Sequence, residues 1–459
     1  MSAGALLGVA ALDALLLVAG LGVLYGLGLV RSGRDALRNA GLALVAGWAA
    51  AGILESWALV AGASLARSVV AALCVAVAGA GVLAGRRVPR IRWGIVRERG
   101  LLRAVAAAGA AIVAVDLGAL LWRAATQGAP LQWDAWAFWL PKARSIVDFG
   151  GLDTGAGGFA SFVSPGYPPL APALDATVFS FTGSTDASPL AVQSWVLAVA
   201  FFAALWSLLS VRVRPAILWP CLALLASLPN VTAMIGSSLG DEPLMLLLGL
   251  GAACAGLWVL EREPRLAALA ALFLAAAALT KNEGLPPALA MGLTMLAAGL
   301  VGSPRRALAP ALVLVAPLVA FAPWRIWMHA HRLPPSPDYS LSDLVRPAVL
   351  ADRFHRLSYA AGALPAHLFS RKEWLVPIPL ALVATALAAR RRPALSILAL
   401  ASFGAVIAAL LAVYWIGDRP VGWYVLTSID RVIAPAVVMA TVFLPLLLDE
   451  AARPDAPSG

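Results

Sequence analysis

The sequence predicts an all-α protein that crosses a membrane many times, and its composition is the first sign. Hydrophobic residues make up 61% of the 459 residues, charged residues make up 13%, and the mean hydropathy is +0.86. A soluble domain carries roughly 25% charged residues. Many apolar runs approach or exceed the ~20 residues that a helix needs to cross a bilayer. The alternating pattern of a transmembrane β-barrel is absent from the sequence.

The apolar runs predict about thirteen transmembrane helices. The first begins without a preceding basic region and is interrupted by Asp13, so we interpret it as a retained helix and not a cleaved signal peptide. One run, 266–279, is short, and we expect it to extend into the flanking sequence. The predicted spans are residues 5–30, 41–64, 67–85, 104–122, 187–210, 216–235, 243–260, 266–279, 285–301, 307–323, 375–389, 394–413 and 433–448.

Arginine clusters in alternate loops predict the orientation, because basic residues in short loops face the cytoplasm. We therefore expect a multi-pass protein of the inner (plasma) membrane with its N-terminus outside and its C-terminus in the cytoplasm. The 324–374 loop is also basic although it falls outside, but long loops follow this rule poorly. The cytoplasmic clusters are Arg31, Arg34 and Arg38; the arginines of 86–103; Arg212 and Arg214; Arg262 and Arg265; Arg305 and Arg306; and Arg390 to Arg392.

The net charge of +10 is thus a topology signal, and we expect no nucleic-acid partner. Cys74, Cys221 and Cys254 all fall inside apolar segments, which predicts neither a disulfide framework nor a cysteine metal site.

Asp134 lies among tryptophans in the segment WDAWAFWLPKAR. Trp133, Trp136 and Trp139 are spaced by three, which predicts that they share one face of an amphipathic helix at the membrane surface. A charge at the edge of an apolar region is a functional candidate. The alternative is an aromatic interface anchor with an incidental aspartate.

The other notable polar residues fall on the same, non-cytoplasmic side. Each has a simpler interpretation: Asp241 and Glu242 suit a helix N-terminus, Lys281 and Glu283 suit a solvated turn, and Arg431 suits an interface residue. Together, however, they surround an expected outward-facing cavity. The set comprises Lys142 and Tyr167 in the 124–186 loop, Asp241 and Glu242, Lys281 and Glu283, Arg325, Arg419 and Arg431.

These residue types indicate a chemistry. Carboxylates suit a general base or sugar hydroxyls, and arginine and lysine suit a phosphate. Tryptophan faces suit sugar rings or a lipid chain. The combination predicts a membrane enzyme that handles a phosphorylated lipid and a carbohydrate.

The ordered motifs resemble the GT-C superfamily of integral-membrane glycosyltransferases that use polyprenyl-phosphate sugars, and most closely its protein O-mannosyltransferase and aminoarabinose-transferase branch. The resemblance divides the chain into additional helices at 1–103, a catalytic core at 104–323 with amphipathic juxtamembrane helices in the outer loop 124–186, and a loop with C-terminal helices at 324–459. The matching elements are Asp134 in the first outer loop, Tyr167-Pro168-Pro169, Asp241 or Glu242 in a short outer turn, Leu279-Thr280-Lys281-Asn282-Glu283-Gly284, and Arg431 before the last span.

The resemblance implies an inverting transfer of a hexose or pentose from the lipid-linked donor to an acceptor hydroxyl, with Asp134 as general base. Lys281 and Arg431 would face the leaving phosphate, with Arg325 or Arg419 as substitutes. Asp241 or Glu242 would position a hydroxyl, and Trp133 and Trp136 would line the entrance. Lys142, Tyr167 and Glu283 complete the expected substrate-binding set.

The chain also departs from the family pattern. Three spans precede the core, the first loop has one acid where many relatives have an adjacent pair, and Asn282-Glu283 is inserted before the glycine of the lysine motif. A lone aspartate is a poor cation site, so we assign no metal ligand, and a divalent cation is the only cofactor left open.

Two other functions stay open. A lipid-linked oligosaccharide polymerase or ligase would use a late outer loop rich in arginine and histidine, which 324–374 partly matches. A lipid-sugar transporter or flippase often has internal repeats, and none is evident. The sugar, and whether the acceptor is a glycan, a lipid or a protein, are not predicted.

Overall fold

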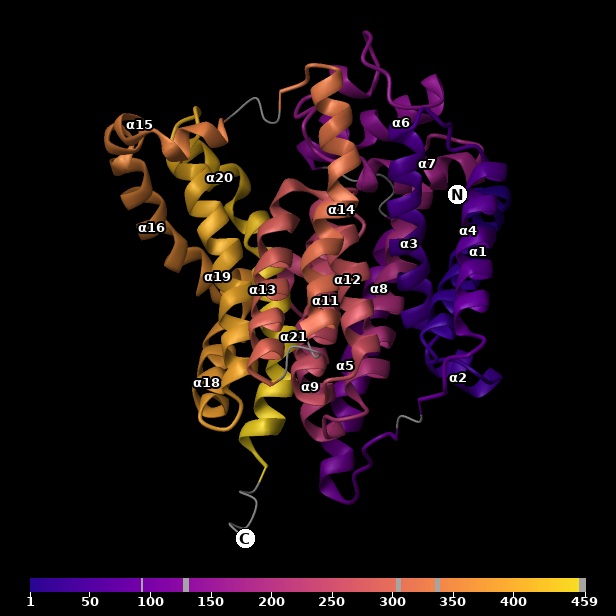
Figure 1. Cartoon of the computed structure of the whole chain (residues 1–459), viewed down its shortest axis with the longest axis vertical. Helices are drawn as coiled ribbons and strands as arrows, with labels where there is room; N and C mark the ends of the chain where they lie inside the picture. Colours follow the sequence, from indigo (N-terminus) through magenta and orange to yellow (C-terminus); the bar gives the residue numbers. More distant parts are fainter. Residues whose placement is uncertain (92–93, 127–131, 303–306, 335–338, 454–459) are drawn as a thin grey trace.

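The computed structural model describes residues 1–91, 94–126, 132–302, 307–334 and 339–453, which form a bundle of α-helices without strands (Figure 1). Ten helical segments in this part of the chain are long and apolar enough to cross a membrane. They are α1 (Ala3–Gly26), α3 (Ala40–Val60), α4 (Arg67–Gly85), α5 (Leu101–Thr126), α8 (Ser188–Leu209), α11 (Asp241–Glu261), η3 (Asn282–Gly284) with α13 (Leu285–Gly302), α14 (Leu308–Ala330), α19 (Pro393–Ile416), and α20 (Val421–Val432) with α21 (Ala434–Ala451).

Three shorter apolar helices complete the apolar set, namely α9 (Pro215–Ala226), α12 (Pro264–Thr280) and α18 (Pro377–Ala389). Each predicted span overlaps a helix, but the single span expected over 216–235 is wrong. There α9 ends at Ala226, and a separate α10 (Pro229–Met234) follows. Pro229 explains the break, because proline lacks an amide donor and disfavours a helical conformation in the residue before it.

Short helices lie at both ends of the bundle. Figure 1 places α2 (Gly33–Arg38) at the lower end and α6 (Leu140–Phe149), α15 (Pro347–Asp352) and α16 (Phe354–Leu368) at the upper end. The remaining short elements are the π-helical turn η1 (Ala135–Trp139), η2 (Phe159–Ser161), α7 (Leu170–Thr182), η5 (Leu341–Val345) and α17 (Arg371–Trp374).

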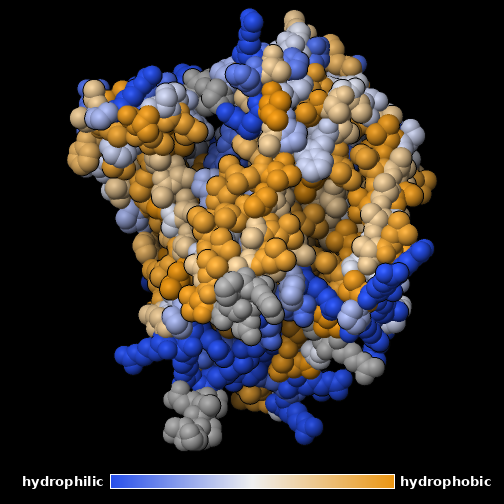
Figure 2. All heavy atoms as spheres, viewed as in Figure 1, coloured by the Kyte–Doolittle hydropathy of each residue, from blue (hydrophilic) through white to orange (hydrophobic). Residues whose placement is uncertain are grey.

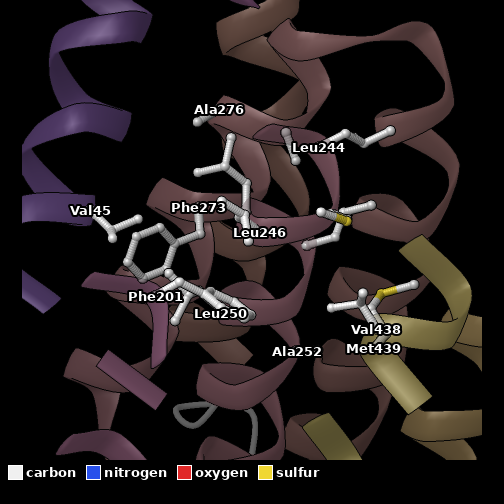
Figure 3. Close-up of a cluster of buried hydrophobic side chains, with 14 of the residues drawn as sticks. Val45, Phe201, Leu244, Leu246, Leu250, Ala252, Phe273, Ala276, Val438 and Met439 are labelled. Carbon is white, nitrogen blue, oxygen red and sulfur yellow. The ribbon is translucent and has the colours of Figure 1, made fainter. Parts of the chain in front are cut away.

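Helix α11 forms the centre of the bundle. Its membrane-spanning window is 94% buried, and it packs against α8, α12, α13 and α21. Figure 3 shows Leu246 and Leu250 of α11 among Phe201 of α8, Phe273 of α12 and Val438 of α21. A helix that is hydrophobic all round is expected to be buried on every side, as this one is.

Glycines allow α1 and α3 to pack closely. A Cβ atom on Gly20 would lie 1.6 Å from the carbonyl oxygen of Ala43, and one on Gly47 would lie 1.8 Å from that of Leu16. Small residues let helix backbones approach in membranes, where dispersion contacts drive association. Since α3 also packs against α8 and α12, the N-terminal helices belong to the same bundle as the rest.

A hydrophobic band covers the middle of the face in Figure 2, and hydrophilic residues gather at the lower end. There the basic loops meet the end of α21. Glu450 contacts Arg212 at 2.5 Å and Arg392 at 2.7 Å, and Asp449 contacts Arg214 at 2.9 Å. Several predicted basic clusters therefore share one end of the molecule. Arg92, Arg305 and Arg306 lie outside the described residues.

The α1–α3 contact leads to a first prediction. Gly47→Ala should push the two helices apart and lower the free energy of unfolding by about 1–3 kcal/mol, as overpacking does. Gly118→Ala on α5 is the matched control, because the added methyl group meets nothing within 4 Å. Thermal unfolding in detergent measures both, and equal stability of the two variants would contradict the predicted close packing.

Candidate functional site

The tryptophan-rich segment adopts a π-helical turn followed by α6. The prediction that Trp133, Trp136 and Trp139 share one face is wrong. Trp133 and Trp136 are both 55% exposed and contact each other edge to face, whereas Trp139 is only 2% exposed. A π-helical turn pairs residue i with i+5, so residues three apart no longer align. Helix α6 does bury one face, which includes Leu140, Ala143 and Ile146.

Trp139 fixes this segment to the start of α11. Its ring stacks on the ring of Tyr167 with the ring centres 5.4 Å apart, and the ring of Phe138 stacks on the same tyrosine at 6.2 Å. A Cβ atom on Gly240 would lie 2.6 Å from the Trp139 ring, so only glycine lets the ring lie against the backbone. This contact holds the Asp134 segment beside Asp241, the residue that follows Gly240.

Six predicted residues join in one network at this end of the bundle, which we call the ion-pair chain. Arg431 Nη1 lies 2.5 Å from Asp134 Oδ2 and 3.9 Å from Asp241 Oδ2. Lys281 Nζ lies 2.8 Å from Asp241 Oδ1 and 3.7 Å from Glu283 Oε1. The hydroxyl of Tyr167 donates a hydrogen bond to Glu283 Oε1 at 3.1 Å.

The members of the ion-pair chain come from ends of different elements. Asp241 begins α11, where the positive end of the helix dipole favours an acid. Lys281 has φ −148° and ψ 154°, so the chain leaves the helical conformation after α12. Arg431 lies in the last turn of α20, and Asp134 precedes η1. Segments far apart in sequence thus converge through their terminal residues.

The Asp241–Lys281 pair is almost completely buried, with side-chain exposures of 2% and 7%. Burial alone would lower the pKa of Lys281, but attraction to Asp241 and Glu283 outweighs burial and raises this pKa above its ordinary value. Burial and the neighbouring Glu283 raise the pKa of Tyr167 well above its usual range, so Tyr167 stays a neutral donor. Three carboxylates then face two cations, which leaves one net negative charge.

Lys142 lies apart from the ion-pair chain. Its side chain is completely buried, and Nζ donates a hydrogen bond to the carbonyl oxygen of Ser164 at 2.6 Å. The ring of Phe159 lies 5.1 Å away, and burial lowers the pKa of the ammonium group to about 7. This lysine holds α6 against the loop that follows it.

Glu242, Arg325 and Arg419 are also directed elsewhere. Glu242 accepts hydrogen bonds from the amide of Gly236 at 2.9 Å and from Ser194 at 3.3 Å. Arg325 lies beside Phe321 and Met328 on α14. The guanidinium of Arg419 lies 5.7 Å from the ring centre of Trp423.

Glu242 instead lines a cavity of about 50 Å³, which Trp139 and Gly240 also border. Glu55, Asp175 and Gln193 line the same cavity. Glu55 accepts a hydrogen bond from Thr177 through one oxygen, while its other oxygen is buried without a hydrogen-bond partner. The volume and the few polar side chains among the mostly apolar lining suit ordered water.

Sequence reasoning missed the residues that brace the site through the backbone. Asn282 Nδ2 and Trp324 Nε1 both donate to the carbonyl oxygen of Gly166 at 3.4 Å. The acceptor is a backbone carbonyl, which every residue has, so the sequence does not indicate where such contacts form. Gly240 also carried no distinct signal, because glycine is common at helix N-termini for reasons unrelated to close packing.

Comparisons of the chain with protein-family models, with curated proteins and with solved structures find no match. The function is therefore inferred from the geometry of the ion-pair chain and its surroundings.

The buried pair gives a second prediction. Lys281→Met leaves the Asp241 carboxylate without its nearest cation and should lower the free energy of unfolding by about 3–5 kcal/mol. The double variant Asp241→Leu with Lys281→Met should recover much of this loss, because no uncompensated charge remains. Denaturant unfolding in detergent tests the pair, with exposed Lys372→Met as the control. Strictly additive losses would contradict the coupling.

Lys142 gives a third prediction. Since its folded pKa is about 7 and the ordinary value is 10.5, the unfolded state binds more protons between these pH values. Stability should therefore rise as pH increases from 7 toward 10.5, and the full penalty of the buried charge applies below pH 7. Lys142→Met removes this dependence.

We expect the melting temperature of Lys142→Met minus that of the wild type to be higher at pH 6 than at pH 9. Lys372→Met provides the matched lysine control. A difference between Lys142→Met and wild type that is the same at both pH values would refute the depressed pKa.

Proposed function

We propose that this chain is an integral-membrane glycosyltransferase of the cell envelope. It would move a sugar from a polyprenyl-phosphate donor to an acceptor hydroxyl with inversion at the anomeric carbon. The ion-pair chain carries this proposal, because it joins an acid of the first loop, an acid that begins the central helix, a lysine between helices and an arginine before the last helix.

Asp134 is the general base in this proposal. Its side chain is 22% exposed, so an acceptor hydroxyl can reach the carboxylate from outside. Asp134 takes the hydroxyl proton while the acceptor oxygen forms a bond to the anomeric carbon. On the opposite side of that carbon, the bond to the phosphate oxygen breaks, and the lipid phosphate leaves with the bonding electrons.

Arg431 is the best-placed cation for the leaving phosphate. It contacts both Asp134 and Asp241 and is 21% exposed, whereas Lys281 is held inside by Asp241. Fixed cations stabilise the charge that develops on a leaving group. A phosphate would also compete with Asp134 for the guanidinium, which would free the carboxylate to act as the base. Lys281 would act mainly by positioning Asp241.

The remaining groups suit a sugar and a lipid. Asp241, Glu283 and the neutral hydroxyl of Tyr167 offer hydrogen-bond partners for sugar hydroxyls. The exposed indoles of Trp133 and Trp136 offer apolar faces for a sugar ring or a lipid chain at the entrance. Glu242, Lys142, Arg325 and Arg419 have other contacts, so we assign them no role in the transfer.

The basic end of the bundle would face the cytoplasm according to the positive-inside rule. The ion-pair chain would then face the exterior or periplasm, where polyprenyl-linked sugars would serve as donors. The N-terminus would be outside and the C-terminus inside, with thirteen spans in a plasma membrane. A GT-C-like core would occupy residues 104–323.

The acid-lined cavity favours one other candidate, a transporter of lipid-linked sugars. Glu55, Asp175 and Glu242 line a cavity inside the bundle. Ionisable residues within a membrane often mark proton or ion pathways. The same residues would then couple ion movement to substrate movement, and Asp134 would not be needed for chemistry.

The decisive experiment gives the fourth prediction. Purified protein in nanodiscs is incubated with radiolabelled polyprenyl-phosphate sugars, and release of polyprenyl phosphate is measured. Asp134→Asn should lower turnover by at least about 100-fold, the scale of general-base catalysis, while donor binding persists. Asp148→Asn is the matched control, because this aspartate lies exposed on the neighbouring helix α6.

Near-normal turnover by Asp134→Asn would remove Asp134 as the base. If no donor is cleaved by folded wild-type protein that still binds lipid-linked sugar, the transporter becomes the better assignment. Donor movement across a vesicle membrane, lost in Glu55→Gln, would then establish transport.

A further inference from the structure

A second polar cluster lies beside the ion-pair chain and takes no part in the proposed reaction. It consists of His367 at the end of α16, Glu373 in α17 and Asp430 in α20. One ligand atom from each residue lies within 4.8 Å of the others. Asp430 directly precedes Arg431 of the ion-pair chain. We call these three residues the α20 triad.

The ligand atoms of the α20 triad lie within reach of a single metal ion. His367 Nδ1 and Asp430 Oδ1 form a hydrogen bond at 2.6 Å, and His367 Nδ1 lies 3.6 Å from Glu373 Oε2. Donor atoms around a tetrahedral ion at 2.0–2.2 Å lie about 3.3–3.6 Å apart, so the His367–Glu373 separation already fits. An ion that replaces the His367–Asp430 hydrogen bond would need these two side chains to move apart by roughly 1 Å. Imidazole and carboxylate are also the ligand types that such an ion prefers.

Glu373 provides an independent indication. Its Oε2 atom is buried without a hydrogen-bond partner, although it lies among polar groups. The carboxylate of Asp430 lies 2.6 Å from the same His367 Nδ1. Two carboxylates thus share a site with one imidazole, and a divalent cation would relieve their repulsion. The neighbouring ion-pair chain carries an excess of negative charge as well.

We propose that His367, Glu373 and Asp430 bind one divalent transition-metal ion of the zinc class. The mixed nitrogen and oxygen ligands favour such an ion over Mg²⁺ and Ca²⁺, which prefer oxygen ligands alone. Three protein ligands leave a fourth position for water. The site is distinct from Asp134 and does not depend on the proposed transferase activity.

The ion would also position Arg431. Consecutive side chains on a helix point about 100° apart, so Asp430 can face α16 and α17 while Arg431 reaches Asp134. Helix α17 packs against α10 next to the start of α11, and its Trp374 is fully buried. A metal ion would therefore connect α20 to α17, which Trp374 and the contact with α10 hold in place. Arg431 could then keep one orientation toward the site.

A proton is the competing occupant of the α20 triad. A protonated His367 would pair with both carboxylates without any metal. The two possibilities differ in a direct measurement, because only the metal site binds Zn²⁺ stoichiometrically.

The test uses the full-length protein in nanodiscs after chelator treatment. Titration with Zn²⁺, followed by elemental analysis, should show one tightly bound ion per chain that excess Mg²⁺ does not displace. Co²⁺ should give a visible absorption band from the same site. His367→Ala, Glu373→Gln and Asp430→Asn should each weaken Zn²⁺ binding by at least about 10–100-fold. His355→Ala, an exposed histidine on the same helix, should bind like the wild type.

Absence of stoichiometric Zn²⁺ binding by the wild type would overturn the proposal, as would undiminished binding in the conservative Glu373→Gln and Asp430→Asn variants. These outcomes do not depend on transferase activity, so they separate this proposal from the function of Asp134. If transfer is established, chelation should lower turnover and added Zn²⁺ should restore it. Unchanged turnover after complete metal removal would overturn the positioning role of the ion.

Discussion

The outer end of the bundle depends on the Asp241 carboxylate, which lies between Lys281 and Arg431. A buried carboxylate is tolerated only when cations or donors compensate the loss of hydration. Here the compensating groups come from the segment after α12 and from α20, and Arg431 in turn holds Asp134. The need to compensate one buried charge therefore brings separate segments of the chain to one place. The ring of Trp139 also lies against the backbone of Gly240, the residue directly before Asp241.

Much of the fold could be predicted from the sequence because membrane helices need long apolar runs. Each predicted run overlaps a helix, but the run 216–235 forms two helices because Pro229 breaks it. The π-helical turn at 135–139 was not predictable from spacing, since an α-helical period was assumed. It decides which tryptophan is buried, and so which residue anchors the first loop.

The candidate site was predicted in part. Asp134, Asp241, Lys281 and Arg431 were expected to gather, and they do, although their catalytic roles stay predictions. Asp241 and Glu242 could not be told apart, because the sequence does not show which of two consecutive acids faces the site. The α20 triad was missed, since His367, Glu373 and Asp430 come together only through the packing of α16, α17 and α20. A histidine without a nearby partner in sequence carries little signal.

The acids at the opposite end have a consequence for the biosynthesis of this protein. Asp449 and Glu450 belong to the last turn of α21, yet they neutralise arginines from loops made earlier. The same helix covers one side of α11. While the ribosome is still translating α21, these arginines lack their partners and the central helix lacks a neighbour. These contacts thus form only after Asp449 and Glu450 emerge, and a chain that stops before Asp449 would leave the described bundle partly assembled for quality-control proteases to recognise.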